Sequence, residues 1–205
     1  MLSQLDNIIF PDRCDVLEIV PSQRYIYPIF KNASSTLYNA GFRCVDHSEL
    51  ADIKNIEVLV RNPFERFISG VQTYIDKLDP DLDRDTVLYF IENNLFLNRH
   101  FCPQFHWLVN LRRFTDAQLN IKPLHYVGTI TTDHQNSSDP DPEIVKYFEN
   151  NDKVHFYLEL DKVLINNLLG KTVSFADIVQ TIKEEYPVVY QEIIQRSKNL
   201  CAVLD

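Results

Sequence analysis

A short polar loop near the N-terminus carries the first residues of this chain whose types are suited to chemistry. Residues 31–36 read KNASST and follow an aromatic, β-branched run at residues 24–30. Small residues let a backbone approach a phosphate closely, N–H groups at a helix start point toward an anion, and a lysine adds a point charge. The loop therefore predicts an anion-binding site. Its candidate ligands are Lys31, Asn32, Ser34, Ser35 and Thr36.

The same loop has a second, purely structural interpretation. A Walker A loop would place glycines before its lysine, and this segment has none. Ser34 or Ser35 would then cap a following helix, and Lys31 would lie in solvent. Both interpretations stay open on the loop alone.

A second cationic loop, residues 61–69 (RNPFERFIS), follows the continuous apolar run IEVLV at residues 56–60. Arg61 ends that run and Ser69 lies eight positions further on, about two helical turns later. The Ser69 hydroxyl can approach an anion held by Arg61 only if the arginine reaches along the helix. Two interpretations of Arg66 remain. It contributes to the anion-binding site, or it pairs with Glu65 or a neighbour on a solvated helix face.

These loops need a sheet that brings them together. A continuous apolar run such as residues 56–60 is typical of a parallel strand covered on both faces, and Pro63 fits the first turn of a helix. We also expect strands at residues 24–30, 42–45, 124–127 and 154–158, and helices at 35–40, 84–94, 103–114 and 174–198, with Pro187 at a start or kink. Such alternation predicts an α/β fold with a central parallel sheet flanked by helices. Ligands bind such sheets beyond the carboxyl ends of the strands, where both loops fall.

The composition describes an ordinary globular protein. The 205 residues fit a single domain spanning residues 1–205, with 45% hydrophobic and 24% charged residues. A net charge of -9 argues against a long nucleic-acid partner, which requires a broad basic face. It still permits a pocket in which a few local cations hold a compact anion.

Cysteines and the N-terminal segment bear on metal binding and localisation. The four cysteines, at positions 14, 44, 102 and 201, form no C-x-x-C pair; neither a zinc site nor a redox motif is indicated, and we expect buried free thiols. Residues 1–11 resemble neither a signal peptide nor a membrane anchor. We therefore expect a cytoplasmic protein without a membrane partner, and residues 131–142 (TTDHQNSSDPDP) as a surface loop.

The two loops together resemble a known family. VPSQRYIYPIFKNASSTL followed by IEVLVRNPFERFISGV is similar to the paired cofactor loops of sulfotransferases that use 3′-phosphoadenosine 5′-phosphosulfate (PAPS), particularly the branch that modifies carbohydrates. Residues 100–104 (HFCPQ) resemble that branch's H-x-x-P-Q segment, and residues 126–128 (YVG) its late strand. Residues 174–198 are similar to the family's closing helical pattern.

The resemblance implies a three-layer P-loop-like fold and a role for each loop. It assigns the loop containing Lys31, Ser34, Ser35 and Thr36 to the 5′-phosphosulfate, and Arg61 and Ser69 to the 3′-phosphate. Asn62 replaces the aspartate usual in the family's second motif, which removes a charge but keeps an acceptor.

The reaction so implied moves a sulfuryl group from PAPS to a hydroxyl, expected to belong to a glycan, without a metal ion. Lys31 would stabilise the charge that develops on the departing phosphate. A histidine suits the acceptor's proton, because its pKa lies near neutrality. His47 is the first candidate, since it follows the strand expected at residues 42–45 and some relatives have a catalytic histidine in a comparable stretch; His100 and His106 are its competitors.

Three further hypotheses come from the sequence. Arg99, Arg112 and Arg113 would hold an acidic acceptor, or would lie on a solvated helix face. A second hypothesis is that the chain is a P-loop-like nucleotide kinase or hydrolase, although it lacks the glycines of a Walker A loop. A third is that the chain is a non-catalytic relative that binds a nucleotide.

Overall fold

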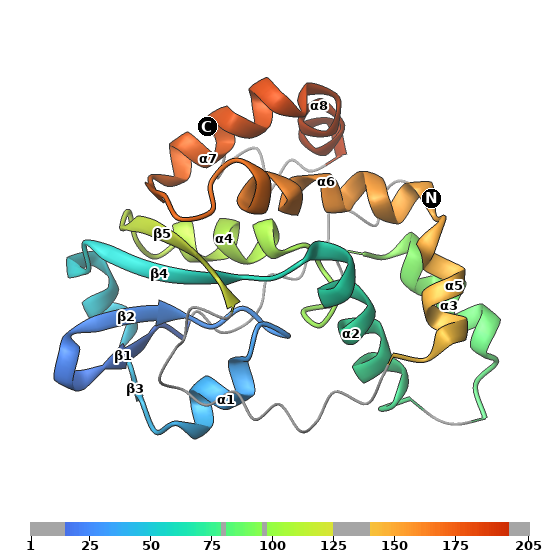
Figure 1. Cartoon of the computed structure of the whole chain (residues 1–205), viewed down its shortest axis with the longest axis horizontal. Helices are drawn as coiled ribbons and strands as arrows, with labels where there is room; N and C mark the ends of the chain where they lie inside the picture. The colour runs from blue at the N-terminus through green and yellow to red at the C-terminus, as the bar shows by residue number, and fades with distance from the viewer. Residues whose placement is uncertain (1–14, 79–80, 96–97, 125–139, 197–205) are drawn as a thin grey trace.

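The computed structural model describes residues 15–78, 81–95, 98–124 and 140–196 as an α/β fold around a mixed, open, six-stranded sheet (Figure 1). Its strand order is β3-β1-β2-β4-β5-β6. The strands are β1 (Leu17–Ile19), β2 (Arg24–Tyr27), β3 (Arg43–Cys44), β4 (Asn55–Val60), β5 (Gln118–Pro123) and β6 (Thr172–Val173).

The sheet is parallel only at its centre. β2 pairs with β4 and β4 with β5 in parallel, whereas β1 is antiparallel to β2 and β3, and β6 is antiparallel to β5. The expectation of a parallel sheet therefore holds for three strands and is wrong for the rest. Only a short 3₁₀ turn, Val20–Ser22, joins β1 to β2, and a connection that short permits antiparallel pairing alone.

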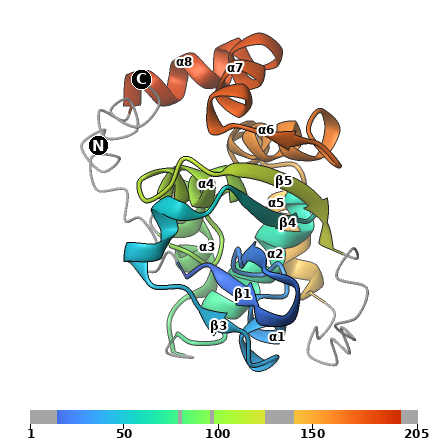
Figure 2. The same cartoon turned by 90° about the vertical axis from the view of Figure 1, so that its left-hand side faces the viewer.

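Helices lie on both sides of the sheet (Figures 1 and 2). α1 lies below β4 as drawn, and α6, α7 and α8 lie above it. The helices are α1 (Ser34–Asn39), α2 (Pro63–Ile75), α3 (Arg84–Asn93), α4 (Gln104–Arg112), α5 (Pro142–Glu149), α6 (Asp152–Asn166), α7 (Phe175–Glu185) and α8 (Pro187–Arg196). A 3₁₀ helix, His47–Asp52, precedes β4.

The alternation of side chains along β4 divides the core between the two faces. Ile56, Val58 and Val60 join the large cluster that contains Trp107 of α4 and Leu158 of α6. Leu59 points the other way and joins the small cluster that includes Leu37 of α1. β4 is therefore largely buried on both faces, as its mostly apolar sequence predicts, although Glu57 is half-buried and pairs with Arg24 of β2.

One of the two expected late strands is wrong. Residues 154–158 lie inside α6, whose buried positions Val154, Leu158 and Asp161 recur at helical spacing, with the Asn151 side chain capping the start. A five-residue apolar run does not distinguish a strand from a buried helix by periodicity alone. The strand expected at residues 124–127 begins just after β5, which ends at Pro123; Leu124 is not part of a strand, and residues 125–127 lie outside the described residues.

The remaining expectations concern single residues and membrane association. Pro187 begins α8, as predicted. Cys102 is buried but Cys44 is exposed on an edge strand, so the expectation of buried thiols fails there; Cys14 and Cys201 lie outside the described residues. No helix within the described ranges is both long enough and apolar enough to cross a membrane.

Candidate functional site

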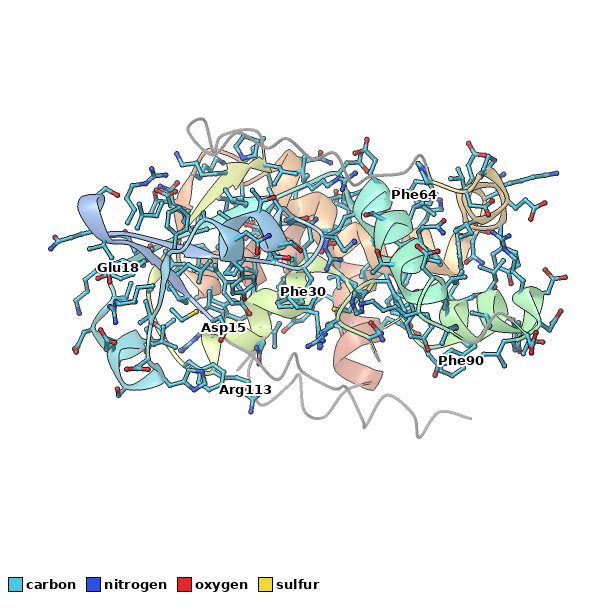
Figure 3. The ribbon with its side chains drawn as sticks, turned by 90° about the horizontal axis from the view of Figure 1, so that it is seen from below. Asp15, Glu18, Phe30, Phe64, Phe90 and Arg113 are labelled. Carbon is cyan, nitrogen blue, oxygen red and sulfur yellow. The ribbon has the colours of Figure 1, made fainter. Side chains whose placement is uncertain are left out.

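The parallel pairing of β2 with β4 brings the two polar loops together. Ile26 lies opposite Glu57 and Tyr27 opposite Val58, so both strands point their carboxyl ends toward the same edge. The loop at residues 31–36 follows the first strand and the loop at residues 61–62 the second. Figure 3 marks these segments by Phe30 and by Phe64 in the first turn of α2.

A pocket of about 400 Å³ lies beside these strand ends. It joins Lys31 of the first loop to Arg61 and Ser69 of the second, three residues that the sequence predicts as ligands. The other lining residues come from α2 and from the segment entering α5: Phe64, Glu65, Ile68, Gln72, Thr73, Asp76, Pro140 and Val145.

Lys31 crosses the pocket to α2. Its Nζ donates a hydrogen bond of 2.6 Å to Thr73 Oγ1, and that hydroxyl donates one of 3.0 Å to the carbonyl oxygen of Ser69. The backbone of Lys31 has a φ of 67°, in the left-handed region that non-glycine residues seldom adopt. The lysine is thus held over the same helix that carries Ser69.

The surroundings of Lys31 are strongly cationic. Burial lowers the pKa of its ammonium group below the ordinary value, and the charges of Lys77, Arg61 and Arg66 lower it further. Asp76 acts in the opposite direction. An anion placed here would relieve the mutual repulsion of these cations.

Arg61 is paired with a side chain that an anion would have to replace. Its Nε lies 3.5 Å from Glu65 Oε2, and the glutamate side chain is 62% exposed while that of Arg61 is 29% exposed. Asn62 caps α2, because its Oδ1 accepts hydrogen bonds from the N–H groups of Phe64 and Glu65. Asparagine thus fulfils the capping role that an aspartate would have at this position.

The rest of the first loop lies outside the pocket lining. Ala33, with a φ of 58°, is the N-cap of α1 and no side chain caps that end, so the interpretation of Ser34 or Ser35 as the cap is wrong. Ser34 is buried, Ser35 is exposed and Thr36 is half-buried. Asn32 is fully buried, and its Nδ2 donates to the carbonyl oxygen of Leu59 (2.7 Å) and to Gln104 Oε1 (2.6 Å).

Arg66 lies inside the protein and has no exposed surface. Its Nε donates to the carbonyl oxygen of Phe30 at 2.9 Å, and its Nη1 donates to the carbonyl oxygen of Cys102. The interpretation of Arg66 as the partner of Glu65 on a solvated face is therefore wrong. The arginine instead ties the segment before Lys31 to the segment before α4.

None of the three candidate histidines is among the residues that line the pocket. His47 is exposed in the 3₁₀ helix before β4, and its ring packs 4.8 Å from the ring of Phe114, which follows α4. His106 is buried in α4 with 1% of its surface exposed. Neither position brings an imidazole next to Lys31.

His100 lies near several cations, including Lys31 and Lys77. Its ring centroid is 5.8 Å from that of Phe30, and its Nε2 lies 3.4 Å from Lys77 Nζ. Burial lowers the pKa of His100 to about 4, with further lowering from the charges of Lys77, Arg99 and Lys31 among others. The imidazole is therefore neutral near pH 7.

Hydrogen bonds define which His100 nitrogen is free to accept a proton. Asn98 Oδ1 lies 2.9 Å from the backbone nitrogen of His100 and 2.8 Å from its Nδ1. A carbonyl oxygen only accepts, so Nδ1 carries the hydrogen in the neutral ring and Nε2 carries the lone pair. The lone pair faces the ammonium group of Lys77.

The arginines considered for an acidic acceptor do not form one group. The Arg99 guanidinium lies 4.9 Å from the ring centroid of Phe30, before the start of α4. Arg112 pairs with Asp116, and Arg113 lies over Phe114, both at the far end of that helix. Only Arg99 is near the pocket.

The sequence analysis did not identify several pocket residues. Gln72 and Thr73 follow Ser69 by three and four positions, so helical spacing alone could have placed them on its face. Pro140 and Val145 enter from a distant part of the chain and carry no comparable signal. Within the described ranges no three His, Cys, Asp or Glu side chains gather as metal ligands.

Comparison of the chain with models of known protein families, with curated proteins and with solved structures gave no significant match.

Proposed function

We propose that this protein is a sulfotransferase that moves a sulfuryl group from PAPS to a hydroxyl acceptor, with a carbohydrate as the acceptor class that the resemblance implies. One observation carries the proposal: Lys31, Arg61 and Ser69, from two separate loops, line a single pocket of about 400 Å³. The pocket volume falls in the range of small-molecule sites. Three parallel central strands with helices on both sides also suit the P-loop-like fold that the resemblance implies.

In the proposed assignment the two cations hold opposite ends of the nucleotide. Arg61, with the Ser69 hydroxyl, binds the 3′-phosphate, because a guanidinium matches phosphate oxygens with paired donors. Lys31 binds on the 5′ side at the bridging oxygen. The remainder of the first loop, including Asn32, Ser34, Ser35 and Thr36, shapes the backbone there.

The reaction follows from these positions. The acceptor oxygen attacks sulfur, the bond from sulfur to the bridging phosphate oxygen breaks, and 3′-phosphoadenosine 5′-phosphate (PAP) leaves. Lys31 stabilises the negative charge that grows on the leaving phosphate, where a cation lowers the barrier most. The acceptor proton passes to a general base.

His100 has better support than His47 for the role of base. Its charge environment includes Lys31, and its imidazole is neutral at pH 7, with an Nε2 lone pair that would become available if the ammonium group of Lys77 moved away. His47 packs against Phe114 instead. The further candidates, a kinase or hydrolase and a non-catalytic relative, are distinguished by experiment.

Calorimetry without added magnesium tests the nucleotide assignment. PAP should bind more tightly than ATP, GTP or AMP. The Arg61→Ala variant should lose about tenfold or more in PAP affinity, the effect expected for one charged hydrogen-bonding partner, while binding adenosine 5′-phosphosulfate almost normally. Arg112→Ala, which removes a surface arginine paired with Asp116, is the matched control.

Other outcomes point to the alternatives. Equal binding of ATP, or an absolute need for magnesium, contradicts the proposal and favours the kinase or hydrolase. Tight PAP binding without sulfuryl transfer to any hydroxyl acceptor in a broad glycan panel favours the non-catalytic relative.

A further inference from the structure

Four fully buried polar side chains connect the segments that form the pocket. They come from the first loop, α2, the start of α4 and the middle of α6: Asn32, Arg66, Gln104 and Asp161, each with 0% of its surface exposed. Buried polar groups lower stability unless they are hydrogen-bonded. Among the described residues, Asn32 Oδ1 and Arg66 Nη2 have no hydrogen-bond partner. The stability of the fold alone therefore does not explain why these four polar side chains are buried together.

Gln104 is the centre of the group. Its Nε2 donates to the carbonyl oxygen of Arg61 at 2.9 Å, and its Oε1 accepts from the Arg61 N–H at 3.0 Å. The amide thus pairs with the backbone of Arg61 on both sides, as a neighbouring strand would. The same Oε1 accepts from Asn32 Nδ2 at 2.6 Å, so one side chain contacts both loops.

Asp161 fixes the position of Gln104. Its Oδ2 and Oδ1 accept hydrogen bonds from the N–H groups of Gln104 (2.7 Å) and Phe105 (2.8 Å). Pro103, the N-cap of α4, has no side chain for that purpose, so a carboxylate from α6 acts as the cap. Arg66 binds the neighbouring carbonyl of Cys102.

We propose that Gln104, held by Asp161, is a positioning residue that sets the separation between Lys31 and Arg61. Asn32 is the next residue after Lys31, and Arg61 is held directly by its backbone, so the amide of Gln104 determines how far apart the two cations lie. This inference rests on the proposed function only in the choice of ligand. A bisphosphate that spans both cations requires the correct separation, whereas a monophosphate requires only one of them.

The test compares PAP with AMP by calorimetry in wild type and in Gln104→Met, which keeps the length of the side chain but loses its hydrogen bonds. The preference for PAP over AMP should fall at least tenfold, while AMP affinity changes less than threefold. A general loss of folded protein would lower both affinities together and leave the ratio unchanged. Gln180→Met, at an exposed glutamine on α7 that bonds Glu184, is the matched control.

A second variant and a ligand-free measurement keep the inference testable if Gln104→Met does not fold. Asp161→Asn leaves Gln104 in place but weakens the cap that holds it, so the preference for PAP should fall by a smaller factor. Without any ligand, amide hydrogen exchange should quicken at Arg61 in either variant. An unchanged preference, or unchanged exchange at Arg61, would overturn the inference. Absence of PAP binding by wild type together with faster exchange in the variants would instead reject the nucleotide assignment alone.

Discussion

At the scale of single residues, the pocket holds cations and carboxylates in equal number. Lys31 and Arg61 line it together with Glu65 and Asp76. Among the residues that the structure describes, Glu65 is the carboxylate that forms an ion pair with Arg61, and it is largely exposed. An incoming phosphate must therefore compete with a carboxylate for the same guanidinium.

Replacing that carboxylate should strengthen binding of a 3′-phosphorylated nucleotide. Glu65→Gln removes an exposed ion pair, which is worth a few tenths of a kcal/mol to about 1 kcal/mol, so PAP affinity should rise about two- to fivefold. Isothermal titration measures the change. Glu49→Gln, which breaks a comparable exposed pair with Arg43, should leave PAP binding as it is. Weaker binding by Glu65→Gln would place the 3′-phosphate away from Arg61.

His100 permits a prediction about protonation. Its pKa of about 4 reflects burial and the surrounding cations, so an anion bound at Lys31 should raise that pKa toward the ordinary value of about 6.5. Nuclear magnetic resonance of the imidazole protons with and without PAP measures the shift. The resonances of His47 should not respond to the nucleotide.

The same pKa determines the pH dependence of the reaction. If His100 is the base, kcat/KM should decline on the acid side near pH 4, because kcat/KM reports ionisation of the free enzyme. His100→Gln should abolish that decline and lower turnover by about a hundredfold or more. A rate that falls through the ordinary histidine pKa and keeps that dependence in His100→Gln would return the role to His47.

At the scale of elements, the pocket depends on how closely α2 approaches the segment before α4. A Cβ added at Gly70 would lie 2.0 Å from the carbonyl oxygen of His100. The contact is with backbone, so no side chain can turn aside. Gly70 thus permits the approach that brings His100 near the helix that carries Ser69 and Thr73.

This contact reverses the usual effect of replacing a helical glycine. Gly→Ala inside a helix normally stabilises by roughly 0.5–1 kcal/mol, but here the added methyl group should lower the free energy of unfolding by about 1–3 kcal/mol, the range for overpacking. Urea denaturation measures the sign directly. A more stable Gly70→Ala variant would mean that the two segments are not in contact.

Element prediction succeeded where one physical signal was sufficient. The buried run of β4 and the proline at the start of α2 identify those elements without tertiary information. The run at residues 154–158 did not identify its element correctly, because a short buried helix segment and a buried strand are equally apolar. The antiparallel margins of the sheet escaped prediction as well, since β1 and β6 have only three and two residues.

At the scale of the whole molecule, Asp161 links the pocket to folding stability. Burial raises the pKa of Asp161 to about 6, above the value in an unfolded chain. Its contribution to stability is therefore fully present at pH values below about 4 and is lost as pH rises through about 6. Two pKa units correspond to about 3 kcal/mol at most.

Urea denaturation of wild type and Asp161→Asn between pH 4 and pH 7 tests this linkage. The variant should be less stable, because Asn replaces one of the two accepting oxygens of Asp161 with an NH₂ group, so one of the two backbone N–H groups would face a donor. The difference in free energy of unfolding between wild type and Asp161→Asn should become smaller as pH rises from 4 to 7. Because other groups that titrate in this range are present in both proteins, their effects cancel in that difference. A difference that stays constant would show that Asp161 titrates as it does in the unfolded chain.

Three residues that line the pocket could be predicted from the sequence, but the residues that support them could not. Lys31 and Arg61 could be found because each has a charged side chain close to an expected strand end, whereas Ser69, two helical turns later, was identified through the family resemblance. Gln104 and Asp161 could not be assigned a structural role, because their partners are backbone groups and their meeting depends on how α4 and α6 pack. Arg66 was ambiguous for the same reason: only tertiary structure separates a buried arginine from a solvated one.

The shape of the first loop does not come from glycine. Lys31 and Ala33 both have positive φ angles, each of which costs roughly 1–2 kcal/mol for a residue with a Cβ. The conformation persists through contacts with α2, β4 and α4, none of which belongs to the loop. A glycine-rich loop adopts positive φ angles without that cost and depends less on such contacts. Residues 31–36 of this chain would not keep their backbone geometry if they were grafted onto another sheet without Arg66, Gln104 and Asp161.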